Sequence, residues 1–339
     1  SKWENGNNVP DVLTMMELAN FFNISVDELL GFDISSKNVD DMCDSIEKLY
    51  DAHDYVRAQR EANEAMTRYP HNFKVLYTCA TLYFFKATEE DDDKDDAETA
   101  IRIYKQALSY ISQNTVPEIS EFSIKERIAN MYRKIDPEKA LDQLKEINYD
   151  GTESALIAAT LMKLERRSEA LNYYSTAILI CFVKQYELSA NTALALASTG
   201  KKEDIKKAHD LIETELGILD LYAIPQKITF IYKLKSLLLI YKAWGSACLG
   251  MTEDMKKCVE EAYALAKAFD DSKVRSEVTD AIKYVYFSKD MVSTHDSIGP
   301  SAESGIEALF KRKHEALTEK NAKYLSIVAD YWNEIKNKK

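Results

Sequence analysis

The sequence predicts an all-α protein, on three observations. Glycine and proline number only 9 and 6 in 339 residues, far below their usual ~7% and ~5%, whereas a sheet-rich chain needs many turn residues. Small side chains recur seven residues apart, which places them on one face of a helix. Apolar residues make up 46% of the chain and the net charge is −12, a balance typical of a globular protein and not of a disordered one.

Residues 1–32 are predicted to hold the end of one helix and two complete short helices. Asp11, which follows Pro10, is a typical N-cap residue with Thr14 three positions later. Apolar residues then follow at helical spacing as far as Phe22. The tetrapeptide at 25–28, Ser-Val-Asp-Glu, has the pattern of a capping box and starts the second short helix.

These residues carry a resemblance to a known family. They read Ser-Lys-Trp-Glu-Asn-Gly at 1–6, Pro-Asp at 10–11 and Leu-Ala-Asn-Phe-Phe-Asn-Ile-Ser-Val-Asp-Glu-Leu-Leu at 18–30. Residues 1–32 thereby resemble the second half of a Cro/C1-type helix-turn-helix domain of the xenobiotic-response-element family. The resemblance implies DNA contacts at Ser1 and Lys2 and a loop near the phosphates that includes Asn5 and Asn7. The alternative is a small helical pack with a chance match.

The resemblance also sets an expectation about DNA binding. In that family, the first two helices and most of the recognition helix precede the stretch that begins here with Ser1. A helix-turn-helix reads bases from the N-terminal part of its recognition helix. Residues 1–32 carry one basic residue, Lys2, against five acidic residues, and phosphate neutralisation dominates DNA affinity. We therefore expect a full-length protein to bind duplex DNA and this chain alone not to do so.

Residues 33–40 are polar and lack periodicity, which predicts a linker. Beyond them, at 41–288, a small or apolar anchor residue recurs and is usually followed by a second one seven positions later. The first anchors of the copies are Ala58, Ala100, Ala140, Ala170, Ala208 and Cys258. The spacings between them are 42, 40, 30, 38 and 50 residues. The pattern resembles the second helix of a tetratricopeptide repeat, although that repeat has a fixed period of about 34 residues.

The anchors predict about six degenerate tetratricopeptide-like helical hairpins wound into a right-handed superhelix. The alternative is an irregular helical bundle, because alanine is common wherever helices cross. The acidic run at 89–96 is expected to be a solvated loop between two helices. Residues 289–339 are predicted to be C-terminal capping helices that start near 301 and near 318. The last of these helices has an apolar stripe through Leu325, Val328 and Trp332, which is expected to pack on the array or on a second subunit.

No catalytic or cofactor-binding motif is present in the sequence. None of the five histidines lies three or four residues from another, so no helical metal pair forms, and glycine-rich phosphate loops and nucleophile elbows are absent. The five scattered cysteines are expected to be buried apolar side chains in a reducing cytosol, which places the protein in the cytoplasm. Apolar runs such as 177–183 are too short to cross a bilayer, so no membrane partner is expected.

The first helices of tetratricopeptide hairpins line a concave surface that commonly binds peptides. Polar and aromatic residues on the predicted first helices are therefore candidate ligand contacts, since asparagine pairs with peptide backbone and tyrosine offers area at small entropic cost. The candidates are Tyr77, Phe84, Asn130, Arg133, Asn191, Tyr232 and Lys235. A Cro-like head joined to such an array resembles the bacterial peptide-sensing quorum regulators.

The resemblance implies a transcription regulator whose array senses a peptide or small ligand, mediates dimerisation, or does both. Because Cro-like heads generally read two half-sites, a homodimer is expected. The competing hypotheses are a tetratricopeptide-type interaction scaffold without DNA binding, and a helical enzyme, for which the sequence offers no positive signal.

Overall fold

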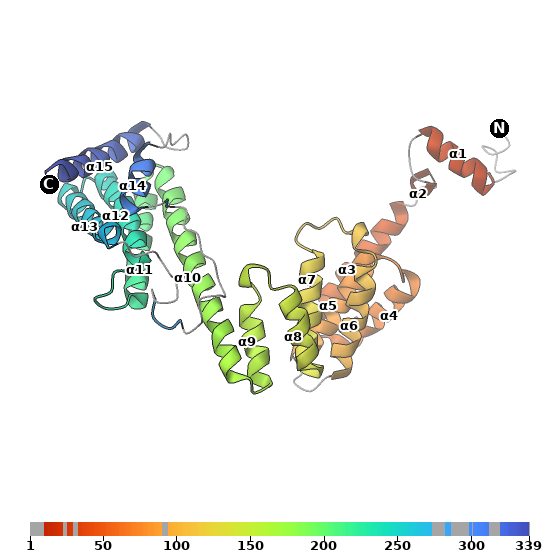
Figure 1. Ribbon diagram of the computed structural model, residues 1–339. Helices are drawn as coiled ribbons and strands as arrows, with labels where there is room; N and C mark the ends of the chain where they lie inside the picture. Colours follow the sequence, from red (N-terminus) through yellow and green to blue (C-terminus); the bar gives the residue numbers. More distant parts are fainter. Residues whose placement is uncertain are drawn as a thin grey trace. The chain divides into compact units, whose positions relative to one another are not determined.

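The computed structural model describes residues 10–22, 26–29, 33–89, 94–272, 282–285, 298–299, 301–311 and 319–338. Within these ranges every extended regular element is a helix (Figure 1), and β pairing is confined to an isolated bridge between Ala223 and Ile282. The all-α prediction is confirmed. The chain divides into two compact units, residues 1–147 and 148–339, which we describe separately.

Unit 1 begins with two short helices in contact with one another, α1 (Val12–Phe22) and α2 (Val26–Leu29). The predicted cap is present, because the Thr14 amide donates to the Asp11 carboxylate at 2.8 Å. The residues that the helix-turn-helix resemblance assigns to DNA, Ser1, Lys2, Asn5 and Asn7, lie outside the described residues.

Three helical hairpins follow in unit 1. They pair α3 (Asp33–Asp51) with α4 (Tyr55–Arg68), α5 (Phe73–Glu89) with α6 (Lys94–Leu108), and α7 (Glu121–Ile135) with α8 (Pro137–Glu146). Helix α5 contacts both α3 and α7, so the first helices of the hairpins form one layer, which we call the first-helix layer. The predicted anchors Ala58, Ala100 and Ala140 lie on the second helices and are fully buried, because a small side chain lets two helices approach closely.

Residues 33–40, predicted to be a linker, form the first turns of α3. Val39, Cys43 and Ile46 are buried at the spacing of a helix face, so the buried stripe of α3 reaches back to Val39. The acidic run is also not entirely a solvated loop. Asp96 lies within α6, is buried, and forms an ion pair with Lys86 of α5.

Unit 2 contains α9 (Ser154–Lys163), α10 (Arg167–Ser198), α11 (Lys202–Tyr222), α12 (Phe230–Leu249) and α13 (Thr252–Asp271). Helix α10 is 32 residues long and packs on both α9 and α11. Its N-terminal half carries the buried anchor Ala170, and its C-terminal half hydrogen-bonds to Glu215 of α11 through Ser189 at 2.8 Å. One helix therefore completes the hairpin with α9 and starts the next hairpin with α11.

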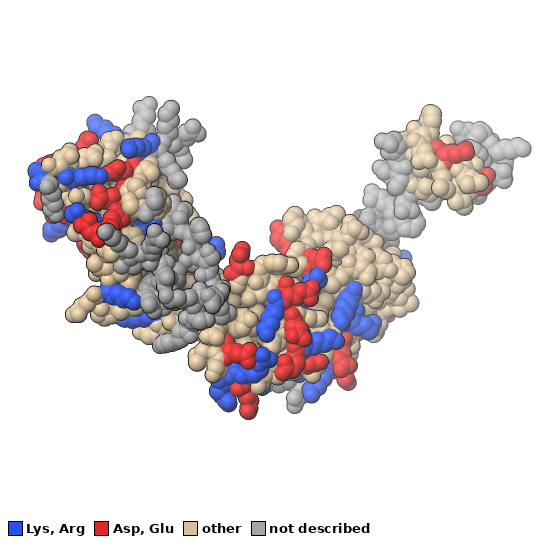
Figure 2. All heavy atoms as spheres, viewed as in Figure 1, with Lys and Arg blue, Asp and Glu red and all other residues tan. Residues whose placement is uncertain are grey.

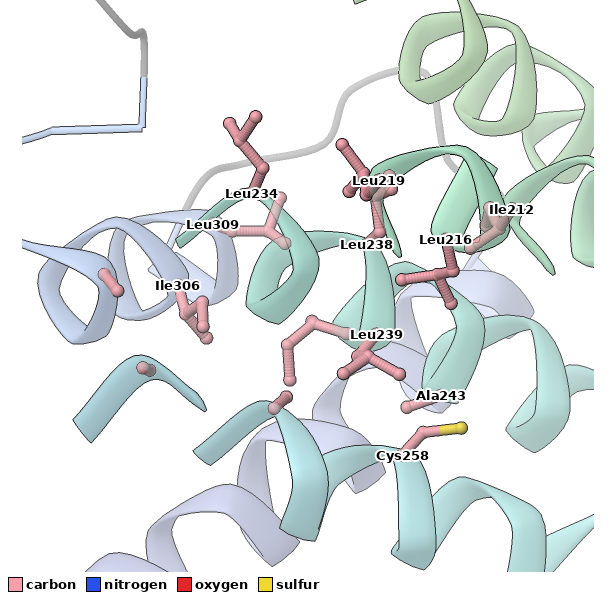
Figure 3. Close-up of a cluster of buried hydrophobic side chains, with 14 of the residues drawn as sticks. Ile212, Leu216, Leu219, Leu234, Leu238, Leu239, Ala243, Cys258, Ile306 and Leu309 are labelled. Carbon is pink, nitrogen blue, oxygen red and sulfur yellow. The ribbon is translucent and has the colours of Figure 1, made fainter. Parts of the chain in front are cut away.

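The C-terminal helices α14 (Ala302–Lys311) and α15 (Glu319–Asn337) each begin one residue after the position expected from the sequence. Both pack on α12 and α13, and Figure 3 shows Ile306 and Leu309 of α14 among the leucines of this core. Trp332 of α15 is fully buried, with its ring centroid 5.2 Å from that of Tyr263. The apolar stripe of α15 therefore packs on the chain's own array, one of the two partners expected for it.

One expectation about the cysteines is wrong. Cys43, Cys79 and Cys258 are buried, but Cys181 is exposed on α10. The buried stripe of α10 runs through Leu179, Phe182 and Tyr186, and Cys181 lies off this stripe despite its apolar neighbours. Among the described residues, no helix is both long enough and apolar enough to span a bilayer.

Candidate functional site

The seven predicted ligand contacts all lie on helices that open a hairpin, but they are divided between the two units. Tyr77 and Phe84 are on α5, and Asn130 and Arg133 are on α7, all in unit 1. The other three, on α10 and α12, belong to unit 2. The unit 1 candidates thus lie on α5 and α7, two helices of the first-helix layer that contact one another.

Arg127 of α7 is the centre of this group. Its guanidinium carbon lies 5.6 Å from the ring centroid of Tyr77 and 5.2 Å from that of Phe84, within the range of a cation–π contact. Tyr77 and Phe84 are seven residues apart, so they lie on the same face of α5 and both reach Arg127. All three side chains are half-buried.

Tyr104 of α6 holds Arg127 from the core side of the layer. The Arg127 Nη1 group donates to the Tyr104 hydroxyl at 3.1 Å, and that hydroxyl lies 3.0 Å from the Thr81 hydroxyl. Burial raises the pKa of Tyr104 to about 12, against the opposing effect of the nearby Arg127 charge. The phenol is therefore neutral at physiological pH, so the network holds the guanidinium in place without neutralising it. We call Tyr77, Phe84, Tyr104 and Arg127 the aromatic–arginine cluster.

Further aromatic side chains extend the surface along α5 towards α3. The ring centroid of Phe85 lies 5.8 Å from that of Phe84 and 5.5 Å from that of Tyr50 on α3. Phe85 is 38% exposed, so part of its ring is open to solvent. The first-helix layer of unit 1 therefore presents a band of aromatic rings with one cation among them.

Asn130 and Arg133 interact with each other one turn further along α7. The Arg133 Nη1 group donates to the Asn130 side-chain oxygen at 2.9 Å. This bond uses one of the two acceptor positions of the Asn130 oxygen. The other acceptor position and the amide nitrogen are the groups that could contact a peptide backbone.

The unit 2 candidates form no comparable cluster in the part of the chain that the structure describes. Lys235 is paired with Asp220 of α11 at 2.8 Å, Tyr232 packs against the hydrophobic core, and Asn191 is exposed on α10. Their proposed role in ligand binding stays a prediction.

Unit 2 does contain a Ser–His–Asp grouping that the sequence did not reveal, because its members are up to 45 residues apart. His209 Nε2 lies 3.3 Å from the Ser246 hydroxyl and 3.5 Å from Asp254 Oδ2. A catalytic triad places serine and aspartate at opposite nitrogens of the histidine. Here one nitrogen faces both, and the Ser246 hydroxyl donates directly to Asp254. The grouping links α11, α12 and α13 and lacks the geometry of a nucleophilic site.

Two cavities of about 440 and 430 Å³ lie on the first hairpin and are not part of the cluster. The first is lined by residues of α4 that include Arg60, Glu64 and Arg68, and the second by these three together with residues of α3 that include Asp41. Within the described ranges, no three His, Cys, Asp or Glu side chains are grouped to hold a metal ion. Figure 2 shows basic and acidic side chains interleaved over α6, α7 and α8.

The sequence pattern missed Arg127 and Tyr104. Arg127 precedes Asn130 by three residues and so shares its helix face, a signal that was readable. Tyr104 falls inside the second-helix segment between Ala100 and Ala107, and its reach across to α7 is a non-local contact that no local pattern encodes.

Comparisons with known proteins add little to these observations. No protein-family model matches the chain, and no curated protein matches it. Among the solved structures to which the chain is similar, two are from Podosopora anserina and are described as a kinesin light chain with nearly identical TPR-like repeats. The first, a point variant of that protein, has 12% identity and a TM-score of 0.25, and the alignment covers 60% of this chain and 98% of that one. The second has 12% identity and a TM-score of 0.25, with 61% and 99% covered.

Proposed function

We propose that this chain is the ligand-sensing part of a DNA-binding regulator and that the first-helix layer of unit 1 binds a short, extended peptide. The observation that supports peptide binding most strongly is the aromatic–arginine cluster. Tyrosine and arginine are enriched among residues that dominate binding energy. Both rings and the guanidinium are held by neighbours before any ligand arrives, so little conformational freedom is lost on binding.

Peptide binding is tested with an immobilised chain and a random heptapeptide library. We expect the wild-type chain to enrich a subset of peptides that the Phe84→Ala variant no longer retains, because this substitution removes one ring of the proposed binding surface. Val56→Ala is the matched control, since Val56 is 81% exposed on the second helix α4. Asn130→Ala is expected to weaken binding and Asn191→Ala tests the separate prediction for unit 2. Equal retention by wild type and Phe84→Ala would contradict a site on this layer.

The DNA-binding part of the proposal rests on the resemblance of residues 1–32 to Cro/C1-type domains. Duplex DNA binding is measured by fluorescence anisotropy on this chain and, where the gene encodes residues ahead of Ser1, on the chain that includes them. We expect binding only with the added residues, and a steep loss of affinity with salt as phosphate contacts require. Enriched peptides should change that affinity, because a regulator needs ligand and DNA to favour different states.

The same resemblance supports a homodimer, because two-fold related heads read two half-sites. Since the α15 stripe is occupied within the chain, the contact must use another surface. Mass measurement by light scattering at micromolar concentration distinguishes dimer from monomer. The alternative function is an interaction scaffold without DNA binding, and a peptide-binding protein that shows no salt-sensitive DNA affinity would favour it.

A further inference from the structure

We infer that the ligand of the first-helix layer carries a carboxylate that pairs with Arg127 beside an apolar or aromatic group. This inference rests on the proposed peptide-binding function and adds the chemical class that the site selects. It follows from the surroundings of one side chain compared with those of other arginines of the chain.

Arg127 is half-buried and has no acidic partner. Among the residues that the structure describes, no carboxylate oxygen lies within 4 Å of its guanidinium, and its hydrogen bond goes to the neutral hydroxyl of Tyr104. Two other arginines do form an ion pair with a neighbouring carboxylate. Arg166 pairs with Glu169 at 2.7 Å, and Arg57 pairs with Asp54 although Arg57 is exposed to water. Arg127 is thus less exposed than Arg57 and, among the described residues, lacks the ion pair that Arg57 forms.

The physical chemistry of this arrangement favours an anionic ligand. A partly desolvated charge is costly unless it is paired and hydrogen-bonded. Guanidinium carries five N–H donors in a planar fork that matches the two oxygens of a carboxylate. Tyr104 accepts from one of these donors, and the rings of Tyr77 and Phe84 lie at cation–π distance from the same group. The hydrogen bond to Tyr104 uses one of the five donors, so others remain from which a carboxylate can accept.

The rings determine what accompanies the carboxylate. Phe84 and Phe85 form an edge-on pair next to the guanidinium, and Phe85 is exposed. A flat or branched apolar group that packs on these rings excludes water from the ion pair and strengthens it. An aspartate or glutamate side chain and a peptide C-terminus both supply the carboxylate, and the experiment separates these two sources.

Three pools of fluorescent heptapeptides serve as probes, and in each pool the identities of the apolar residues are randomised. The first contains one Asp or Glu and ends in an amide, the second contains only neutral residues and ends in a free carboxylate, and the third is neutral and amidated. Retention on the immobilised chain is measured for each pool. We expect the first or the second pool to be retained at least about tenfold better than the third, as charge-assisted hydrogen bonds imply. Which of the two it is identifies the source of the carboxylate.

Arg127→Gln should abolish the better retention of the carboxylate-bearing pool over the neutral, amidated pool, while the neutral pool binds as before. Arg102→Gln is the matched control, because Arg102 lies on the exposed face of α6, and it should leave the difference between the pools unchanged. Arg127→Lys keeps the charge and loses the planar fork, so it should retain part of the excess, and this part should fall with salt. Circular dichroism checks that each variant is folded.

Equal retention of all three pools by the wild-type chain, with loss of retention in Phe84→Ala, would overturn the carboxylate preference and leave the peptide-binding proposal intact. Retention of no pool above the Phe84→Ala level would overturn peptide binding, and the inference with it.

Discussion

The guanidinium of Arg127 and the phenol of Tyr104 connect two hairpins of unit 1, since Arg127 is on α7 and Tyr104 is on α6, and their hydrogen bond measures 3.1 Å. Tyr104 is fully buried and its hydroxyl also contacts Thr81 of α5 at 3.0 Å. A single phenol oxygen thus joins three helices next to the proposed ligand site. Its removal is expected to affect stability and ligand binding together.

Tyr104→Phe should lower the free energy of unfolding by about 1–3 kcal/mol, because Thr81 and Arg127 lose a partner in a buried setting. Urea denaturation followed by circular dichroism measures the change. Tyr110→Phe is the matched control, since the Tyr110 hydroxyl contacts His71 at 2.7 Å in an exposed position and its loss should cost less. An equal effect of the two substitutions would show that the buried hydrogen bonds of Tyr104 stabilise the fold no more than the exposed hydrogen bond of Tyr110.

The buried ion pair between Lys86 and Asp96 should behave as a unit. Their side chains are 17% and 10% exposed, so Lys86→Met strands a carboxylate and should cost about 3–5 kcal/mol. Combining it with Asp96→Leu should restore most of this loss, which a double-mutant cycle in urea detects. Lys74→Met breaks the exposed pair with Asp40 and should cost at most about 1 kcal/mol. Additive losses from Lys86→Met and Asp96→Leu would exclude coupling between the two residues.

Two helical glycines should respond in opposite directions to alanine. A Cβ atom at Gly217 in α11 meets no atom within 4 Å, so Gly217→Ala should stabilise by about 0.5–1 kcal/mol through the higher helix propensity of alanine. A Cβ atom at Gly305 in α14 would lie 2.2 Å from the Ile298 carbonyl oxygen, and backbone must shift to admit it. Gly305→Ala should therefore destabilise by roughly 1–3 kcal/mol. Thermal unfolding compares the two, and a stable Gly305→Ala protein would contradict the close approach of Ile298 to α14.

The cysteines should differ sharply in reactivity towards iodoacetamide. Burial raises the pKa of Cys43 and of Cys258 to about 11. A raised pKa means less thiolate at every pH below it, so at pH 8 roughly one thiol in a thousand is reactive. Mass spectrometry should find Cys181 alkylated first, because it is exposed. Raising the pH to 10 should speed modification of the buried thiols, whereas early labelling of Cys43 would show that α3 opens readily.

Local pattern predicted much of the fold but little of the site. The alanine anchors located the second helices because close helix contact demands a small residue at a fixed spacing, as at Ala58 and Ala65. The start of α3 was missed because residues 33–40 are mostly polar, with Ile34 and Val39 five positions apart as their apolar members. At the site, Tyr77 and Phe84 were predicted as aromatic residues on a first helix of a hairpin. The role of Arg127 depends on contacts with residues more than 20 positions away, and such contacts are decided by how hairpins pack.

Helix α10 has a consequence for the way unit 2 opens. The same uninterrupted helix belongs to the hairpin with α9 and to the hairpin with α11. Unfolding of one hairpin therefore disrupts a helix that also forms half of the other hairpin. Unit 2 is therefore expected to lack the independent, repeat-by-repeat fraying of a linear array. The amide protons along α10 should exchange with solvent as one cooperative block, at a single opening free energy.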